Sequence, residues 1–437
     1  MFVDRDRLAA TPARETALDC VEAGVAAARP AAVVDDRVAL DGDLLRVDDA
    51  EYDLTSHDEV VVLGGGKAAG QVAAALEAVL GDRIADGAVV TDDPVETERV
   101  DVLAGDHPVP SEQGVESTRT VRELAAAAEE DTLVLAVVTG GASALLPAPT
   151  ADLDLAALRG STRDLLDAGA EIDAVNAVRK HCSALKGGRL AAQAAPATVV
   201  GLLFSDVVGD DPAVVGSGPT APDDTTFADA VAVLDRYDLD SPVRDHLERG
   251  VDGDLSETPG SGAAVFDRVE NHVLANAWTA LDAARERAEE RGYEALVLSS
   301  RVRGEARESA TTHVAVAEEV ATTGTPVEPP AVLLSGGETT VTVRGDGEGG
   351  PNQEFALSAA LDLDADVAVA SVDTDGRDGS TDAAGGLVDA STVSDDAAAR
   401  DALADNDAYS FLDAAGALVR TGRTGTNVND LRVFVVE

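Results

Sequence analysis

Short apolar runs alternate with helix-length amphipathic segments along most of the chain, and this alternation restricts the fold more than any other feature. Apolar runs bounded by glycine and polar residues predict buried β-strands. In the first half they lie at Glu59–Leu63, Gly87–Thr91, Thr132–Val138 and Thr198–Phe204. Helices are predicted between them, one ending near Leu80 and one over Ser111–Glu130. Strands alternating with such helices favour an α/β fold with a mostly parallel sheet.

The second half shows the same alternation after a break. A chain of 437 residues exceeds what one hydrophobic core usually serves, so two domains are expected. Glycine, proline and acidic residues are enriched at Arg249–Gly262, which marks a boundary. Beyond it we predict helices and strands at Asn276–Arg291, Tyr293–Ser299, Gly304–Thr322 and Ala331–Ser335. The predicted domains are residues 1–248 and a smaller α/β domain over 263–437.

The composition is strongly acidic. Asp and Glu number 82 against 33 Lys and Arg, a formal net charge of −49. At about 1 M ionic strength the Debye length is roughly 3 Å, so we interpret the acidity as adaptation to concentrated salt. The charge argues against nucleic acid or an acidic membrane surface as a partner. Because 45% of the residues are hydrophobic, disorder is not expected.

Cysteine usage and hydropathy bear on the compartment. Cys20 and Cys182 are the two cysteines, and they make no disulfide framework. We find no apolar signal segment and no apolar stretch long enough to span a membrane. The sequence therefore predicts a cytoplasmic protein without a membrane partner.

Residues 174–205 contain no Asp or Glu, although the average composition would place about six there. They carry Arg179, Lys180, Lys186 and Arg189, and so hold two of the three lysines in the chain. Such a local positive field suits an anionic ligand. We assign Arg179 and Lys180 to the substrate and Lys186 to the cofactor, although the sequence does not separate these roles. The alternative is a helix whose cationic face binds no ligand.

The third lysine, Lys67, directly follows Gly64, Gly65 and Gly66 at the end of a predicted strand. In α/β sheets ligands bind at this end, and glycine lets the backbone approach a phosphate. We predict that the glycines bind a nucleotide and that Lys67 is catalytic, neutralising charge on the phosphates. One alternative is a glycine-rich packing turn. Another is a dinucleotide site, because Gly64, Gly66 and Ala69 also satisfy GxGxxA.

A second glycine-rich turn follows the strand predicted at Thr132–Val138. It contains Gly140, Gly141 and Ser143, which we assign to nucleotide binding. Ser143 is not expected to be a nucleophile, because the GxSxG elbow needs glycine at position 145, which is Leu.

Carboxylates follow the strand predicted at Thr198–Phe204. Asp206 and Asp210 are candidate Mg²⁺ ligands, Asp206 also as a catalytic residue and Asp210, with Gly209, as part of the cofactor site. Mg²⁺ is commonly held by one or two carboxylates together with substrate phosphates. In so acidic a chain either Asp can equally be a solvated surface residue. The six histidines lack metal-ligand spacing.

The C-terminal third contains polar, glycine-rich segments that resemble active-site loops. Asn352 and Glu354 lie at the start of a helix predicted over Asn352–Leu363, where they can bind substrate hydroxyls. Asp375 lies in the segment TDGRDG and is a further candidate for substrate binding. The spacing of the acids in that segment does not match a Ca²⁺-binding EF-hand loop.

Taken together, these segments resemble the class II glycerate kinases, the glycerate 2-kinase group whose C-terminal part is called the MOFRL domain. The matching stretches occur in family order and are GGGKAAG, GDHPVP, TGGASALL, NAVRKHCSALKGGRLA, SDVVGDDPAVVGSGPTAPD, LLSGGETTVTV, GGPNQE, TDGRDGSTDAAG and TGTNVNDL. The resemblance implies a Rossmann-like N-terminal domain, a MOFRL region over about 331–437 and an active site between the domains. It also implies phosphorylation of D-glycerate by ATP and Mg²⁺, usually to 2-phosphoglycerate, with Lys67 at the position of the catalytic lysine.

One departure from the family pattern concerns a cation. The family motif GGRNQE has an arginine implicated in catalysis, and this chain has Pro351 there. Two arginines occur where the family usually has an apolar residue and a proline, namely Arg377 and Arg423. Our hypothesis is that Arg377 or Arg423 acts as the replacement catalytic cation. The alternative is that both are ordinary arginines in a chain that uses arginine for nearly every positive charge.

Two other functions remain open at this stage. The GxGxxA match supports a nicotinamide-dependent hydroxypyruvate reductase, and the polar loops would also suit a non-enzymatic sugar-acid-binding protein. The sequence leaves the oligomeric state open, with a homodimer among the alternatives.

We expect the protein to lose its fold in dilute buffer. At 0.1 M salt the Debye length is about 10 Å, so repulsion among the surplus carboxylates is no longer screened. Far-UV circular dichroism across a KCl series should show helical signal in molar salt and its loss well below that. Full helicity at about 0.05 M KCl would contradict this interpretation of the acidity.

Overall fold

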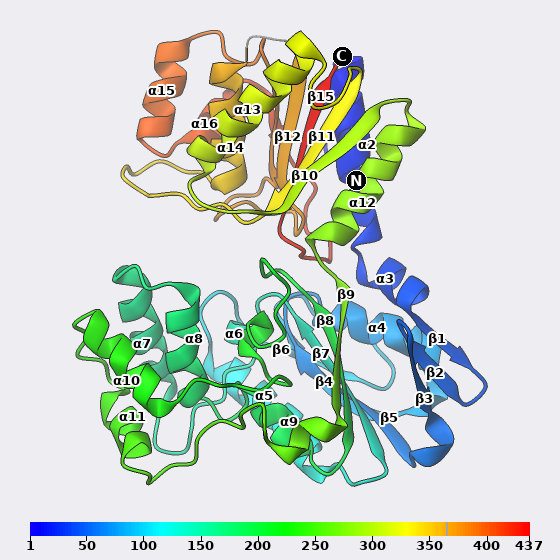
Figure 1. Cartoon of the computed structure of the whole chain (residues 1–437), viewed down its shortest axis with the longest axis vertical. Coiled ribbons are helices and arrows are strands. Elements are labelled where there is room, and N and C mark those ends of the chain that lie inside the picture. Colours follow the sequence, from blue (N-terminus) through cyan, green and yellow to red (C-terminus); the bar gives the residue numbers. More distant parts are fainter. Residues whose placement is uncertain (364–365) are drawn as a thin grey trace. The chain divides into compact units, whose positions relative to one another are not determined.

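Two six-stranded sheets organise the computed structural model, which describes residues 1–363 and 366–437 (Figure 1). Each sheet belongs to its own compact unit. The parallel-sheet unit comprises Val33–Ser205 and Asp210–Leu274. The mixed-sheet unit comprises Met1–Ala32, Asp206–Gly209 and Ala275–Glu437.

The sheet of the parallel-sheet unit has the strand order β6-β5-β4-β7-β8-β9. The strands are β4 (Glu59–Gly65), β5 (Ile84–Thr91), β6 (Asp101–Ala104), β7 (Thr132–Thr139), β8 (Thr198–Phe204) and β9 (Val269–Ala275). From β6 to β8 all pairings are parallel. The chain moves outward from β4 in one direction to β5 and β6, and in the other to β7 and β8. The carboxyl ends of β4 and β7 therefore form a topological switch point, where open α/β sheets bind ligands.

Helices and a small hairpin sheet complete the parallel-sheet unit. The helices are α4 (Ala69–Leu80), α5 (Glu112–Ala127), α6 (Ala142–Leu145), α7 (Leu155–Asp167), α8 (Ile172–His181), α9 (Arg189–Ala194), α10 (Phe227–Arg236) and α11 (Arg244–Val251). The antiparallel strands β1 (Val38–Asp41), β2 (Leu44–Val47) and β3 (Ala50–Asp53) form the small sheet.

The sheet of the mixed-sheet unit has the order β10-β11-β15-β12-β13-β14. Its strands are β10 (Glu294–Val302), β11 (Ala331–Gly337), β12 (Val367–Asp373), β13 (Gly385–Asp389), β14 (Leu418–Val419) and β15 (Asp430–Val436). β10 and β11 are parallel, and the remaining pairings are antiparallel. The last strand of the chain, β15, thus lies between β11 and β12.

Helices cover both faces of this mixed sheet (Figure 1). On one face α2 (Pro12–Ala27) and α12 (Ala277–Glu290) pack against Val433 and Val435 of β15. On the other, α13 (Ala306–Thr323) and α14 (Pro351–Asp362) pack against Phe434 and Val436. Successive residues of β15 therefore enter opposite cores, as the two-residue period of a strand requires. The unit also contains α1 (Arg5–Leu8), α15 (Asp396–Ala404) and α16 (Ala408–Ala414), and α3 (Pro30–Arg37) spans the change of unit.

The predicted α/β class and parallel sheet are confirmed, and β8 has the predicted bounds. The division of the chain differs from the predicted ranges 1–248 and 263–437. Met1–Ala32 group with the C-terminal residues because α2 buries its apolar face, including Leu18 and Val21, against α12 and the mixed sheet. The segment Arg249–Gly262 lies within the parallel-sheet unit. No helix of the described ranges is long and apolar enough to cross a membrane.

The glycines before Lys67 are required by close packing of strands. Gly64 has φ +140°, and a Cβ there would lie 1.8 Å from the carbonyl oxygen of Val137 in β7. Gly66 has φ +136°, and its Cβ would lie 2.1 Å from Thr139 Oγ1. These two glycines thus let β4 end directly against β7, and the phosphate approach expected from the sequence stays a prediction.

Gly64→Ala should destabilise the parallel-sheet unit by more than about 3 kcal/mol, through the backbone clash and the positive φ together. The matched control is Gly262→Ala, because a Cβ at Gly262 would meet nothing within 4 Å. Equilibrium urea unfolding of both variants in molar KCl measures the difference. A Gly64→Ala variant as stable as Gly262→Ala would show that the two strands separate without cost.

Candidate active site

Lys67 lies at the switch point between β4 and β7. Its N–H donates to Gly140 O at 2.8 Å, and its carbonyl oxygen accepts from Thr91 Oγ1 at 3.0 Å. The turn is therefore fixed to the ends of both β7 and β5. A Cβ on Gly141 would lie 3.0 Å from Lys67 Cγ and 3.0 Å from His107 Cδ2. The lysine stem thus crosses Gly141 beside the His107 ring, and the two glycine-rich turns form one surface.

A cavity of about 440 Å³ adjoins this surface within the parallel-sheet unit. Gly141 and Ser143 line it from the turn after β7, and His107 from the loop after β6. α7 supplies one wall, while Arg179 of α8 and Lys186 line it from the acid-free stretch. Its volume falls within the range of about 300–1,000 Å³ that is typical of small-molecule sites.

The cavity has the opposite charge to the rest of the protein. Within the described part of the chain, its lining includes Arg159, Arg163, Arg179 and Lys186 but a single acid, Asp167. Arg179 and Lys186 have no carboxylate partner among the described residues, although the chain contains 82 carboxylates. Burying cations without a counter-ion is costly. A bound anion would remove that cost, which makes this cavity the best candidate for a phosphate or carboxylate site.

Lys186 is 4% exposed, and its ammonium donates to Leu146 O at 2.8 Å. Burial, and secondarily the charge of Arg179, lowers the pKa of Lys186 to about 7. Burial also lowers the pKa of Arg179. The charge of Lys186 therefore changes near neutral pH, and an anion beside it would favour the protonated form.

Ser143 belongs to a chain of hydrogen bonds at the cavity wall. Its hydroxyl lies 2.7 Å from Ser217 Oγ, which donates to Asn176 Oδ1 at 3.0 Å. The buried residues Ser217 and Asn176 therefore orient the Ser143 hydroxyl. A nucleophilic serine would instead need a general base as its hydrogen-bond partner. The assignment of Ser143 to nucleotide binding stays a prediction.

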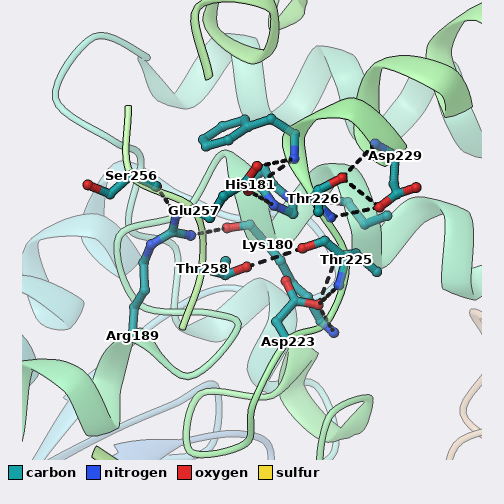
Figure 2. Close-up of polar contacts among 12 residues, drawn as sticks. Lys180, His181, Arg189, Asp223, Thr225, Thr226, Asp229, Ser256, Glu257 and Thr258 are labelled. Carbon is teal, nitrogen blue, oxygen red and sulfur yellow. Dashed lines mark hydrogen bonds and ion pairs between the residues drawn. The ribbon is translucent and has the colours of Figure 1, made fainter. Parts of the chain in front are cut away.

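The remaining cations of the acid-free stretch, Lys180 and Arg189, make polar contacts with surrounding loops (Figure 2). Lys180 is buried and forms an ion pair with Asp223 at 3.2 Å. Arg189 donates to the carbonyl oxygens of Lys180 and Ser183 at 2.6 and 3.0 Å. Lys180, assigned above to the substrate, is thus engaged by Asp223, and the stretch divides into Arg179 and Lys186 at the cavity and Lys180 and Arg189 in the supporting loops.

The carboxylates after β8 are divided between the units. Asp206 and Gly209 group with the mixed-sheet unit, and Asp206 Oδ2 accepts from Asn427 Nδ2 at 3.4 Å. Asp210 groups with the parallel-sheet unit and has φ +58°. Across the ranges that the structure describes, no three His, Cys, Asp or Glu side chains gather as in an all-protein metal site. The donor set fits only a Mg²⁺ ion that takes most ligands from phosphate and water.

In the mixed-sheet unit, Asn352 and Glu354 are buried and bonded to protein groups. Asn352 Nδ2 donates to Asp430 Oδ1 at 2.6 Å, and its Oδ1 accepts from Ser371 Oγ. Glu354 Oε2 accepts from Arg307 Nε at 2.6 Å, and its Oε1 from Asn406 Nδ2. The contacts give both residues a structural role in holding the start of α14, in place of the predicted binding of substrate hydroxyls.

The loops of Arg377 and Arg423 lie together in the same unit. Thr424 N donates to Asp375 O at 3.2 Å, and a Cβ at Gly376 would lie 2.0 Å from Gly422 O. Asp375 Oδ1 accepts from the N–H of Arg377, so its carboxylate shapes this loop. Both arginine side chains are exposed.

The Arg377 loop also contacts the start of α14. Asp378 is buried, and its carboxylate accepts from the N–H groups of Asn352 and Gln353 at 3.0 and 2.8 Å. Pro351 is in the first turn of α14, where the missing N–H costs nothing. The loop that contains Arg377 thus lies against the first turn of α14, through Asp378.

Sequence reasoning missed His107, Ser183, Arg159 and Arg163 as cavity residues. The motif GDHPVP was a signal for His107, because it formed part of the family pattern. Nothing in the sequence distinguished the arginines of α7 from other surface arginines, since the approach of α7 to the glycine-rich turns is a tertiary contact.

Comparison with known proteins agrees with this geometry. Residues 16–250 match a domain of unknown function, DUF4147, and residues 331–430 match the MOFRL family. A D-glycerate 2-kinase of Thermotoga maritima is 40% identical over 87% of this chain and 91% of its own length. The solved structure of a glycerate kinase from T. maritima superposes with a TM-score of 0.83, at 36% identity, covering 97% of this chain and 99% of that one.

The chain belongs to the glycerate kinase family. The family resemblance inferred from the ordered motifs is thereby confirmed over nearly the whole chain. A relative from Agrobacterium vitis bears the name putative hydroxypyruvate reductase and is 41% identical over 86% of this chain and 87% of its own length. The names given to relatives thus include both enzymes considered from the sequence.

For this glycerate kinase family member we expect ADP to bind more weakly as the pH rises. The pKa of Lys186 in the folded protein, about 7, lies below the ordinary value of 10.5. Between pH 6 and 8 the lysine therefore loses the proton that an anion requires, and the Kd should increase about tenfold.

Calorimetric titration with ADP in molar KCl measures this dependence. Lys186→Arg is the matched control, because it keeps the charge throughout this range. The same pH dependence in both proteins would contradict a role for the Lys186 proton.

Proposed function

We propose that the protein is an ATP-dependent kinase that phosphorylates the 2-hydroxyl of D-glycerate. The observation that carries the proposal is the cationic cavity beside Lys67 in a member of the glycerate kinase family. Phosphoryl transfer needs positioning and charge neutralisation more than covalent chemistry from the protein. Lys67 is held by backbone hydrogen bonds, and Arg179 and Lys186 supply positive charge that no carboxylate of the described residues neutralises. The hydroxyl of Ser143 is oriented by Ser217. Together these groups can position and neutralise a phosphoryl group.

Residues in and beside the cavity have proposed roles. Lys67 neutralises the transferring phosphoryl group, because its backbone is fixed on both sides by hydrogen bonds. Lys186 and Ser143 bind the nucleotide phosphates, with Gly140 and Gly141 allowing close approach. Arg179 binds an anionic group of either substrate.

Mg²⁺ would enter with the nucleotide. Asp206 and Asp210 remain the proposed ligands, since one or two carboxylates suffice when phosphates and water complete the octahedron. The ion would neutralise charge on the phosphates. Asn427, which donates to Asp206, would orient that carboxylate.

The alternative function, a nicotinamide-dependent hydroxypyruvate reductase, is favoured by the name of one relative and by the GxGxxA match. The packing role of Gly64 and Gly66 weakens it, because the close contact of β4 with β7 already accounts for these glycines. Arg179 and Lys186, which have no carboxylate partner in the part of the chain that the structure describes, also suit a polyphosphate.

Phosphorus NMR of purified protein with ATP, Mg²⁺ and D-glycerate in molar KCl tests the function. A 2-phosphoglycerate resonance should appear and should require Mg²⁺. Formation of 3-phosphoglycerate would overturn the proposed position of phosphorylation. Absence of any ATP consumption, with oxidation of NADH when hydroxypyruvate is supplied, would establish the reductase instead.

Lys67→Ala should lower kcat by roughly 10²–10³-fold or more, since a preorganised charge at the transition state is lost. Lys67→Arg serves as the control that keeps the charge, and equal urea midpoints for the two variants would show that both are folded. Near-normal kcat in Lys67→Ala would remove Lys67 from the catalytic machinery.

We further propose that Arg377 or Arg423 supplies the cation that Pro351 lacks. Their loops contact each other, and the Arg377 loop contacts the first turn of α14 through Asp378. Arginine suits the role because its planar guanidinium binds phosphate in a bidentate manner.

Arg377→Ala and Arg423→Ala, singly and together, test this compensation by separate measurement of kcat and KM. Loss of the replacement cation should lower kcat about tenfold or more, and adding Pro351→Arg should partly restore it. The matched control is Arg344→Ala, an exposed arginine of the same unit. Normal kcat in the double variant would show that the reaction proceeds without this arginine.

A further inference from the structure

The exposed rim of the cationic cavity carries two apolar side chains beside the charged Arg163 and Asp167. Val109, from the loop after β6, and Leu166, from α7, both line the cavity, and each is 55% exposed. Single exposed apolar side chains are ordinary on protein surfaces. Two of them on separate segments, at the mouth of one cavity and on a surface rich in carboxylates, indicate contact with a ligand.

The floor and the mouth therefore differ in what they can bind. At the floor, Lys186 and Ser183 are buried, and Arg179 has no carboxylate partner within the described residues. This end suits an anion. At the mouth, the exposed surface of Val109 and Leu166 suits a flat, weakly polar group, which it would remove from water.

We infer that this cavity is the seat of the whole nucleotide, with the phosphates at Lys186 and Arg179 and the purine base between Val109 and Leu166. Glycerate fits the cavity poorly as sole occupant. It is a three-carbon acid with a polar group on every carbon, so it would occupy a small part of about 440 Å³ and leave Val109 and Leu166 without a contact. A nucleotide matches both ends and the volume.

The inference rests on the proposed kinase function and adds which residues bind the base. Apolar contacts at the mouth discriminate little among base edges, because every base has a flat face. We therefore expect ATP and GTP to be accepted with similar KM.

The experiment compares a nucleotide with its phosphate part alone. Val109→Ser and Leu166→Ser replace exposed side chains, so the fold should persist. Each should weaken ADP binding about fivefold, through loss of apolar area, and leave the Kd of inorganic tripolyphosphate unchanged. Val251→Ser is the matched control, because Val251 is 51% exposed in the same unit and does not line the cavity.

Calorimetric binding in molar KCl does not depend on turnover, so it separates this inference from the proposed function. Equal ADP affinity in wild type, the two variants and the control would overturn the base seat, even if the protein phosphorylates glycerate. An increase in the Kd of tripolyphosphate by the same factor as the Kd of ADP would also overturn the proposed base-binding role of Val109 and Leu166. A raised KM for glycerate with unchanged KM for ATP would assign the cavity to the acceptor.

Discussion

The close approach of β4 to β7 is the constraint on which the rest of the candidate site depends. At Gly64 and Gly66 a side chain would overlap the backbone of β7 or Thr139 Oγ1, so the strands meet only because both positions lack a Cβ. With the strands at this distance, the N–H of Lys67 reaches Gly140 O. The two glycine-rich turns then form one surface at the point where the sheet order reverses.

Carboxylates are abundant on the protein surface but scarce in the lining of the cavity. The surface carries a large excess of carboxylates, while the cavity lining includes four basic side chains and, among the described residues, one acid. Within the described ranges Arg179 and Lys186 have no carboxylate partner, and burial lowers the pKa of both side chains. Such unfavourable burial is typical of functional sites, where a ligand supplies the missing counter-charge.

Arg432 and Asp430 form a buried ion pair in the mixed-sheet unit. Arg432 is fully buried, donates to Asp430 at 2.5 Å and to Thr339 Oγ1, and lies over the ring of Phe355. Burial raises the pKa of Asp378 to about 7, although two helix N–H groups oppose the shift. These contacts fix the start of α14 and the adjacent Arg377 loop. Asn352, which sequence reasoning assigned to the substrate, is bonded to Asp378 and Asp430 in this network.

The sequence by itself determined the α/β class, most strand and helix positions, the turn that carries Lys67 and the family, because strand and helix periods and ordered motifs are local properties of the chain. The tertiary structure decided the rest. The packing of α2 on the mixed sheet was not predictable, because an apolar helix face can pack against any complementary apolar surface. The tertiary structure also directed Arg179 and Lys186 to the cavity and Lys180 to Asp223, because the direction of each side chain depends on how α8 packs against loops distant in sequence.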